Sequence, residues 1–291
     1  MDTETALAYE HCQRITKSEA KNFYYGFRTL PVNRRLAIYA AYAFCRICDD
    51  IADGPSPVNE KKQLLSQTRQ ALLRAKNTPT SDPIFTALTH TIKTFNISTD
   101  HFASVIDGVE MDLVQTRYQN FADLREYCYK VASSVGLICI EIFGYKSADA
   151  KLHAIDIGIA MQLTNILRDL KEDAQRGRIY IPLNEIVSFG YSEEELMRGI
   201  INDAFRSLMR HQTARAKNYF KNGQKLLPLV PVESRACPTM LIEVYSRILG
   251  RIEESDFDVF TRRVKLGSIE KLIMVAKLWT MSLTSSHIQK R

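Results

Sequence analysis

The sequence has few residues that interrupt helices and no long apolar run. Its 291 residues include only 12 glycines and 9 prolines, which is few for a loop-rich all-β protein and compatible with long helices. No segment reaches the ~18 uncharged apolar residues of a membrane span, and Lys277 and Thr280 interrupt the most apolar one, 272–283. Residues 1–16 lack the basic flank and apolar run of a secretory signal. We therefore expect a cytoplasmic protein, with peripheral contact with a membrane as the alternative.

The sequence also lacks the residue patterns of several cofactor sites. Of its six cysteines only Cys45 and Cys48 are close together, no second pair completes a zinc site, and the usage fits a reducing cytoplasm. The six histidines are scattered, and there is no P-loop, dinucleotide fingerprint or nucleophile elbow. The net charge of +6 suits anionic ligands but is too diffuse to indicate nucleic acid.

Helical periodicity dominates the remaining sequence, and no alternating strand pattern of useful length appears. We expect helices at 36–53, 60–77, 84–95, 99–114, 121–143, 151–172, 203–221, 233–251 and 268–282, with a further charged helix from about residue 192. No shift in composition marks a domain boundary. The sequence therefore predicts one all-α domain over residues 1–291, with about ten helices.

Two aspartate pairs with the same spacing, Asp49/Asp53 and Asp169/Asp173, each end a long apolar segment. An i, i+4 spacing places both carboxylates of a pair on one helical face, where like charges repel. Both pairs are expected near a helix C-terminus, the unfavourable end of the helix dipole for an anion. A shared cation would offset both effects, and carboxylate oxygens suit Mg²⁺, which also binds substrate phosphates.

Other interpretations of the pairs remain. Each pair can simply mark where a buried helix emerges into water. This interpretation is weakened because there are two such pairs and each continues a nearly uncharged helix. A calcium-binding loop starting at Asp49 matches several EF-hand positions, but Ile51 replaces a ligand and Pro55 and Pro57 break the required geometry.

Polar and basic residues accompany the second pair. Gln162, Asn165 and Asp169 follow an i, i+3, i+7 spacing and so share one helical face, as in the wall of an active site. Arg178 lies on the loop just beyond, which Gly177 makes pliable; such a loop can close over a diphosphate, or it can be an ordinary solvated loop.

Arg46 stands in an otherwise apolar helical segment, three residues before Asp49. A charged side chain in this setting needs an anionic partner. The partner is either Asp49 or Asp50, in a structural ion pair, or the diphosphate of a substrate, whose oxygens suit a guanidinium fork.

Several segments, read together, resemble the squalene/phytoene synthase family from about residue 16 to residue 278. They are 23–27 (FYYGF), 42–53 (YAFCRICDDIAD), 127–136 (YCYKVASSVG) and 162–182 (QLTNILRDLKEDAQRGRIYIP). Segments 140–145 and 251–264 look closest to the bacterial presqualene diphosphate synthases of squalene and hopanoid pathways, although phytoene synthases share most of the motifs. One departure is Ser133, where many members carry glycine.

The resemblance implies a class I isoprenoid synthase fold, an all-α helical bundle around a central cavity. It implies Mg²⁺ ligands at Asp49, Asp53, Asp169 and Asp173, and a substrate-binding set of Arg46, Arg168, Arg178, Arg263, Phe23, Val131 and Ala132. The reacting centre would be lined by Tyr42, Tyr127, Gln162, Asn165 and Tyr245, with Tyr127 as candidate proton relay.

The implied activity is that of a Mg²⁺-dependent prenyltransferase. We expect it to condense two farnesyl diphosphates to presqualene diphosphate, with continuation to squalene requiring NADPH. The first alternative is a phytoene synthase that uses two geranylgeranyl diphosphates, and the second is a catalytically silent helical binding protein of the same fold. The expected partners are the two prenyl diphosphates and no nucleic acid; the sequence does not predict an oligomeric state.

Overall fold

The structure is a computed structural model that describes residues 1–20, 23–75, 80–267 and 270. The regular secondary structure of these residues is helical, apart from one isolated bridge between Arg117 and Ile179. Its elements are α1 (Thr3–Glu19), α2 (Tyr24–Phe27), α3 (Val32–Asp53), α4 (Val58–Ala75), α5 (Pro83–Phe95), α6 (Thr99–Asp112), α7 (Phe121–Cys128), η1 (Tyr129–Ser133), α8 (Ser134–Phe143), α9 (Ala150–Arg168), α10 (Leu170–Gln175), α11 (Leu183–Ser188), α12 (Glu193–Met197), α13 (Asp203–Gly223), η2 (Gln224–Leu229) and α14 (Val232–Glu254). The expected helix at 268–282 lies outside the described residues apart from residue 270. Within the described ranges no helix combines the length and apolarity that crossing a bilayer requires.

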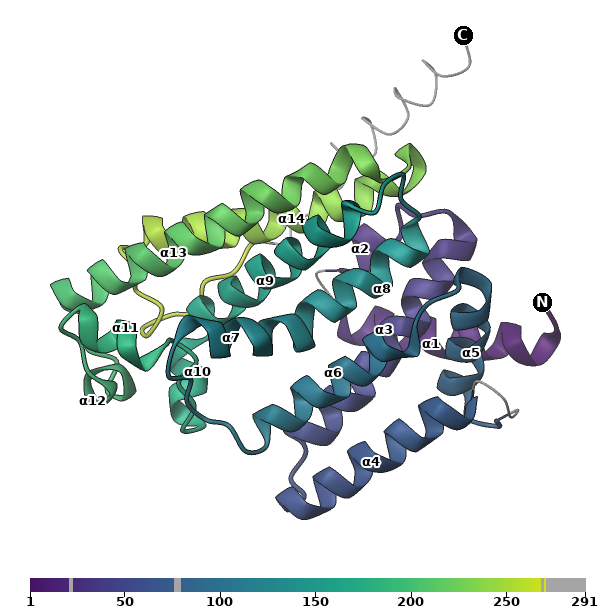
Figure 1. The fold of residues 1–291 in the computed structure, drawn as a ribbon, viewed down its shortest axis with the longest axis horizontal. Coiled ribbons are helices and arrows are strands. Elements are labelled where there is room, and N and C mark those ends of the chain that lie inside the picture. Colours follow the sequence, from purple (N-terminus) through teal and green to yellow (C-terminus); the bar gives the residue numbers. More distant parts are fainter. Residues whose placement is uncertain (21–22, 76–79, 268–269, 271–291) are drawn as a thin grey trace, which may run out of the picture.

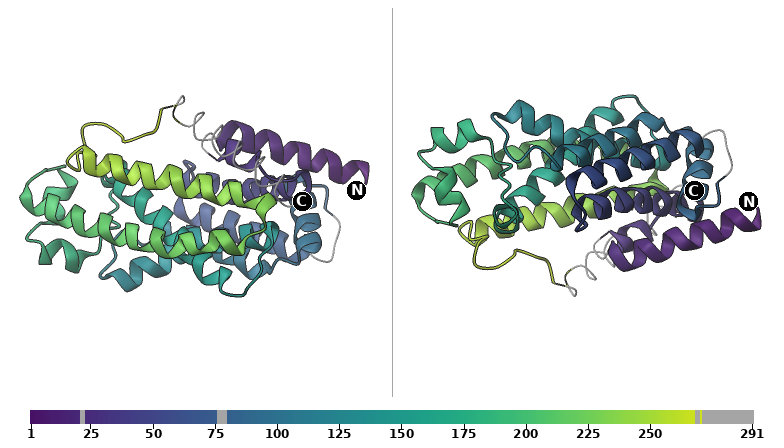
Figure 2. Two further views of the ribbon diagram at one scale, coloured as in Figure 1. Left: turned by 90° about the horizontal axis from the view of Figure 1, so that it is seen from above. Right: turned by 90° about the horizontal axis from the view of Figure 1, so that it is seen from below.

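The long helices lie roughly in layers, with α9 in the middle. In Figure 1, α13 and α14 run along one side of the molecule and α4 along the opposite side, with α9, α8, α6 and α3 between them. Helix α9 contacts α13, α14, α8 and η1, and α1 packs against α3 and α5. The two further views in Figure 2 show that α13 and α14 stay side by side along most of their length. This arrangement places the C-terminal ends of α3, α6 and α9 near one another.

Helix α3 is buried along most of its length and carries the first aspartate pair. It begins at Val32, after Pro31, and so four residues before the predicted start. Phe44 packs edge-on against Phe102, with ring centroids 5.3 Å apart, and both side chains are fully buried. The helix continues to Asp53, so Asp49 and Asp53 lie one turn apart on it, as predicted.

The predicted helix at 121–143 is interrupted by η1, one wide turn of π-helix. This turn is wedged between Gly108 of α6 and Gly158 of α9. A Cβ atom on Gly158 would lie only 2.5 Å from the Cα of Ser133. The Ser133 hydroxyl donates a hydrogen bond of 2.8 Å to the carbonyl of Ile155 in α9. Close backbone packing with α9 therefore accompanies the wide turn. The predicted helix over 121–143 is confirmed, but the π-helical turn within it was not predicted.

The predicted helix at 151–172 also divides, at the second aspartate pair. Helix α9 ends at Arg168, Asp169 has φ −104° and ψ 14°, and α10 begins at the next residue. The prediction of a position near a helix C-terminus is confirmed for Asp169, the C-cap of α9, and wrong for Asp173, which lies in the first turn of α10. The backbone N–H of Asp173 still donates to the Asp169 carbonyl at 3.0 Å, so the two residues stay one turn apart.

Candidate functional site

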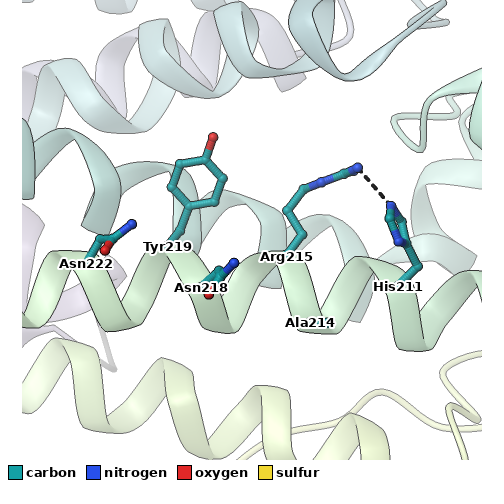
Figure 3. A pocket seen from close by; sticks show the side chains of 6 residues that line it. All are labelled: His211, Ala214, Arg215, Asn218, Tyr219 and Asn222. Atoms are coloured by element: carbon teal, nitrogen blue, oxygen red, sulfur yellow. Dashed lines mark hydrogen bonds between the residues drawn. The ribbon is translucent and has the colours of Figure 1, made fainter.

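An open groove of about 510 Å³ follows one face of α13 (Figure 3). Its charged groups are already engaged. Arg215 donates to both carboxylate oxygens of Glu185, at 2.6 and 2.8 Å, and its guanidinium lies 3.9 Å above the ring of Phe121. None of the residues predicted for catalysis or binding lines this groove. The chemistry predicted from the sequence is therefore located elsewhere.

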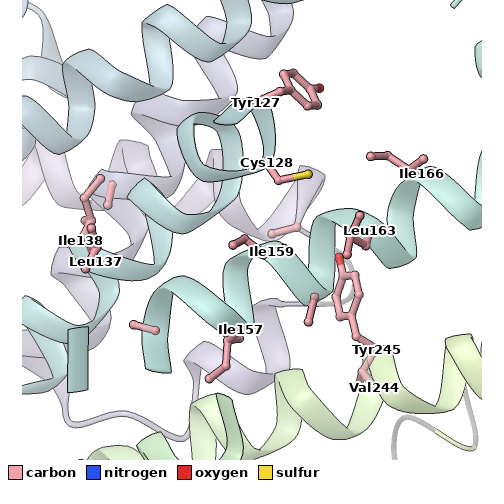
Figure 4. Packing of buried hydrophobic residues seen from close by; sticks show 14 of the residues in the cluster. Tyr127, Cys128, Leu137, Ile138, Ile157, Ile159, Leu163, Ile166, Val244 and Tyr245 are labelled. Atoms are coloured by element: carbon pink, nitrogen blue, oxygen red, sulfur yellow. The ribbon is translucent and has the colours of Figure 1, made fainter. Parts of the chain in front are cut away.

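An apolar cavity of about 340 Å³ lies between α3, α6, η1, α8, α9 and α14. Eight of the predicted residues line it together with many aliphatic side chains, and five of these line this cavity alone: Phe23, Tyr42, Val131, Ala132 and Tyr245. Figure 4 shows the Tyr245 ring reaching from α14 toward Leu163 of α9. This lining can enclose hydrocarbon chains and exclude water from them.

A polar cavity of about 230 Å³ adjoins the apolar one. Asp49, Val109, Gln162 and Asn165 line both cavities, so these residues form the boundary between them. The other predicted residues in the wall of the polar cavity are Arg46, Asp53, Tyr127, Asp169, Asp173 and Arg178. The structure thus brings fourteen of the sixteen predicted site residues into the walls of two adjoining cavities.

Arg168 and Arg263 are the two predicted residues that line neither cavity. Both contact Asp169 instead. Arg168 donates from Nε and Nη2 to its two oxygens, at 2.8 and 2.5 Å. Arg263, on the segment after α14, lies 2.9 Å from Asp169 Oδ1 through its Nη2. Two guanidiniums therefore neutralise this one carboxylate.

The aspartates differ in how their charges are balanced. Although the Asp49 carboxylate is open to the cavity, the surrounding protein raises its pKa to about 7, and Asp53 adds to this effect. Burial, together with the charge of Asp169, also raises the pKa of Asp173 to about 7. Burial alone would raise the pKa of Asp169 as well, but the Arg168 and Arg263 guanidiniums hold it below its usual value. Asp49 and Asp173 are thus the carboxylates with most to gain from a cation.

Arg46 forms its ion pair with Asp50, at 2.6 Å, rather than with Asp49. Glu19 lies 3.8 Å from the same guanidinium. The Nε of Arg46 is buried and has no hydrogen-bond partner among the described residues. Of the two alternatives for Arg46, the structural ion pair is present, and its Nε remains as a donor for a further anion.

The loop after α10 forms a fixed part of the cavity wall in this structure. Arg178 donates to the backbone carbonyl of Asp112 at 3.0 Å, and Ile179 donates through its N–H to Thr116 at 2.9 Å. Arg117 donates to the carbonyl of Gly177 at 2.7 Å. The loop that we expected to be pliable is thus held along the segment that follows α6.

Sequence analysis missed Asp112, a fifth aspartate in the wall of the polar cavity. It ends α6, and its carboxylate accepts hydrogen bonds from Tyr127 at 2.9 Å and from Tyr180 at 2.7 Å. Its sequence signal was weak, because it is a single acidic residue at a helix C-terminus with no partner four residues away.

The donors around the polar cavity fit Mg²⁺. In the described part of the chain no three metal-ligating side chains are already gathered into a metal-binding cluster. The cavity nevertheless presents carboxylates from α3 and from the α9–α10 junction, which are the hard oxygen ligands that Mg²⁺ prefers. The side-chain oxygen of Asn165 is buried and has no hydrogen-bond partner among the described residues, so it is a further oxygen donor.

Comparisons with known proteins agree with this geometry. The family described as squalene/phytoene synthase matches residues 16–270. The 15-cis-phytoene synthase of Synechococcus elongatus is 36% identical, over 91% of this chain and 90% of its own. Phytoene synthase 2 of Solanum lycopersicum is 35% identical, over 95% of this chain and 91% of its own.

Two solved structures share the fold. A dehydrosqualene synthase superposes with a TM-score of 0.88 at 29% identity, covering 97% of this chain and 98% of its own. The squalene synthase HpnC from Alicyclobacillus acidocaldarius gives a TM-score of 0.84 at 28% identity, covering 88% of this chain and 97% of its own. The predicted isoprenoid synthase fold is thereby confirmed.

Proposed function

The chain belongs to the squalene/phytoene synthase family, and we propose that it joins two geranylgeranyl diphosphates head to head to form phytoene. The observation that carries the choice of substrate is the set of curated relatives. Eight of them, all named phytoene synthases, are 34–36% identical to this chain and match between 91% and 97% of it.

These relatives correct our expectation from the sequence. We expected two farnesyl diphosphates and presqualene diphosphate, because segments 140–145 and 251–264 looked closest to the hopanoid branch. The curated relatives contradict that assignment and favour the alternative, a phytoene synthase. Most motifs of the family serve the diphosphates and the reacting carbons, which are the same for both chain lengths, and so these motifs could not discriminate.

The two cavities suit the two halves of a prenyl diphosphate. The diphosphate groups would occupy the polar cavity, where Arg46 and Arg178 supply guanidinium donors. The prenyl chains would occupy the apolar cavity, with Val131 and Ala132 in its wall. The reacting carbons would then lie at the boundary, beside Gln162.

We propose that Asp49, Asp53, Asp169 and Asp173 hold Mg²⁺, which would neutralise the charge that develops on a departing diphosphate. The chain's own residues have the complementary tasks. Arg178 binds the diphosphate, and the apolar cavity keeps water away from the carbocation. Tyrosine rings offer their faces to the passing cation, and Tyr127 lies at the polar side as the candidate proton relay.

The reaction consists of two ionisations. In the first, a C–O bond of one substrate breaks and diphosphate leaves with the electron pair; the double bond of the second substrate attacks the allylic cation, and loss of a proton closes a cyclopropane. In the second, the remaining diphosphate leaves, the ring opens, and loss of another proton gives the C40 hydrocarbon. Two protons and two diphosphates are released, so this sequence consumes no NADPH.

The test is to incubate purified protein and Mg²⁺ with geranylgeranyl or farnesyl diphosphate, with and without NADPH, and to identify the products by mass spectrometry. We expect phytoene from the C20 substrate without NADPH, and none after chelation of the metal. Asp49→Asn should abolish the product, whereas Asp203→Asn, at the exposed start of α13, should not.

Two outcomes contradict the proposal. A product from the C15 substrate alone would exclude the phytoene assignment. The absence of product from both substrates would favour the catalytically silent binding protein.

A further inference from the structure

Asp112 differs from the four proposed metal ligands in what its carboxylate contacts. Both of its oxygens accept hydrogen bonds from tyrosine hydroxyls, Oδ2 from Tyr127 at 2.9 Å and Oδ1 from Tyr180 at 2.7 Å. Its backbone carbonyl accepts from Arg178 at 3.0 Å. No guanidinium or ammonium group forms an ion pair with this carboxylate within the described ranges. Asp112 thus connects α6, α7 and the loop after α10 through polar contacts.

The tyrosines around Asp112 form a compact aromatic cluster. The rings of Tyr127 and Tyr180 are stacked, with centroids 5.2 Å apart, and Tyr118 stacks on Tyr180 at 5.7 Å. Tyr127 is only 3% exposed and Tyr180 only 6%. Stacking sets the planes of the rings, while the carboxylate sets the direction of the two hydroxyl protons. The Tyr127 hydroxyl therefore has one preferred orientation.

This orientation has a chemical consequence. An ionised carboxylate only accepts hydrogen bonds, so the Tyr127 hydroxyl must direct its proton toward Asp112. The lone pairs of the phenol oxygen are then available to the cavity. A hydroxyl that donates to an anion also carries more negative charge on its oxygen, which favours both acceptance of a proton and stabilisation of a nearby cation.

We propose that Asp112 is a positioning residue that holds Tyr127 with its phenol oxygen presented to the reacting carbons, and that it is not a metal ligand. This inference rests on the proposed function, because it assigns Asp112 a part in the same prenyl transfer. Two other roles make different predictions. A fifth metal ligand would change the Mg²⁺ requirement, and a purely structural brace would change stability without changing kcat.

The test is a double-mutant cycle in kcat with Asp112→Asn, Tyr127→Phe and the double variant. Asn keeps the shape of Asp112 but removes the charge. The resulting fall in kcat should be about 10- to 100-fold, which is smaller than the loss expected when a general acid or base itself is removed. The double variant should be no worse than the more damaging single variant, within about 3-fold, because both changes remove the same interaction. KM and the Mg²⁺ concentration for half-maximal rate should stay within about 3-fold of the wild type.

Asp107→Asn is the matched control, because Asp107 lies on the same helix, is half-buried, and pairs with Arg69 outside the cavity. It should leave kcat unchanged. If Asp112→Asn does not fold, Tyr180→Phe removes one hydroxyl from the same carboxylate and should lower kcat by about 3- to 10-fold.

Several results would overturn the inference. The first is an unchanged kcat in Asp112→Asn or, if that variant does not fold, in Tyr180→Phe. The second is a double variant whose loss in kcat equals the product of the two single losses. The third is a rise of about 10-fold or more in the Mg²⁺ concentration that Asp112→Asn requires, which would make Asp112 a metal ligand. A wild type that makes no product from either prenyl diphosphate would overturn the proposed function itself. Normal wild-type turnover with an unaffected variant would overturn only the role of Asp112.

Discussion

Replacement of Gly158 by alanine tests whether the close contact between α9 and the π-helical turn shapes the cavity. A Cβ atom at this position would lie 2.5 Å from the Cα of Ser133, 2.6 Å from its nitrogen and 2.8 Å from the carbonyl carbon of Ala132. All three are backbone atoms, so no side chain can rotate away to make room. Either α9 or η1 must move, and η1 carries Val131 and Ala132 of the apolar cavity wall.

The expected loss of stability follows from two opposing terms. Inserting a methyl group into a close-packed contact costs about 1–3 kcal/mol. Alanine in a helix interior is favoured over glycine by about 0.5–1 kcal/mol, which offsets part of that cost. The midpoints of the two ranges leave a net loss of about 1 kcal/mol, which corresponds to a fall in Tm of roughly 2–4 °C for a chain of this size. Because the cavity wall shifts with the turn, KM for the prenyl diphosphate should also rise.

Gly250→Ala is the matched control for this prediction. Gly250 lies within α14, and no heavy atom lies within 4 Å of a Cβ placed there. Only the helix-propensity term remains, so this variant should gain about 0.5–1 kcal/mol and retain full activity. Thermal unfolding by circular dichroism and steady-state kinetics measure both effects. A Gly158→Ala variant with the Tm and KM of the wild type would refute the reasoning.

Arg263→Gln removes one of the two guanidiniums on Asp169, and KM for the prenyl diphosphate should rise by about 10-fold. Tm should change little, because this arginine is half exposed. An unchanged KM in steady-state kinetics would exclude a contact between Arg263 and the diphosphate. Glu185→Gln should cost about 2 kcal/mol at pH 7, because it weakens the charged hydrogen bonds to Arg215. These bonds hold the pKa of Glu185 below its usual value despite partial burial. The stabilisation is therefore present above the unfolded pKa of about 4.3 and is lost as pH falls through the lower folded pKa. Denaturant unfolding of the wild type and of Glu185→Gln between pH 7 and pH 3 should show the difference in their unfolding free energies disappear. A difference that stays constant over this pH range would contradict this reasoning.

The sequence predicted the helices well where one apolar stripe faces the core. The helix predicted at 99–114 is α6, Thr99–Asp112, and the one predicted at 203–221 is α13, Asp203–Gly223. The sequence did not predict the two places where the hydrogen-bonding pattern changes without a glycine or proline, the π-helical turn η1 and the break at Asp169. The residues of η1 and Asp169 have ordinary helical side chains, and contacts with other helices accompany the wide turn at η1.

The placement of the predicted site shows a similar limit. Spacing identified Asp49/Asp53 and Asp169/Asp173, and family motifs identified further residues of the cavity walls, such as Tyr42 and Tyr245. Asp112 could not be found in this way, because its partners Tyr127 and Tyr180 are 15 and 68 residues away in the chain. Asp112 has an unremarkable local sequence, and only the fold gives its carboxylate the two hydroxyl donors. A single acidic residue at the end of a buried helix therefore merits the same search for partners as a pair, since the helix dipole disfavours an anion there in both cases.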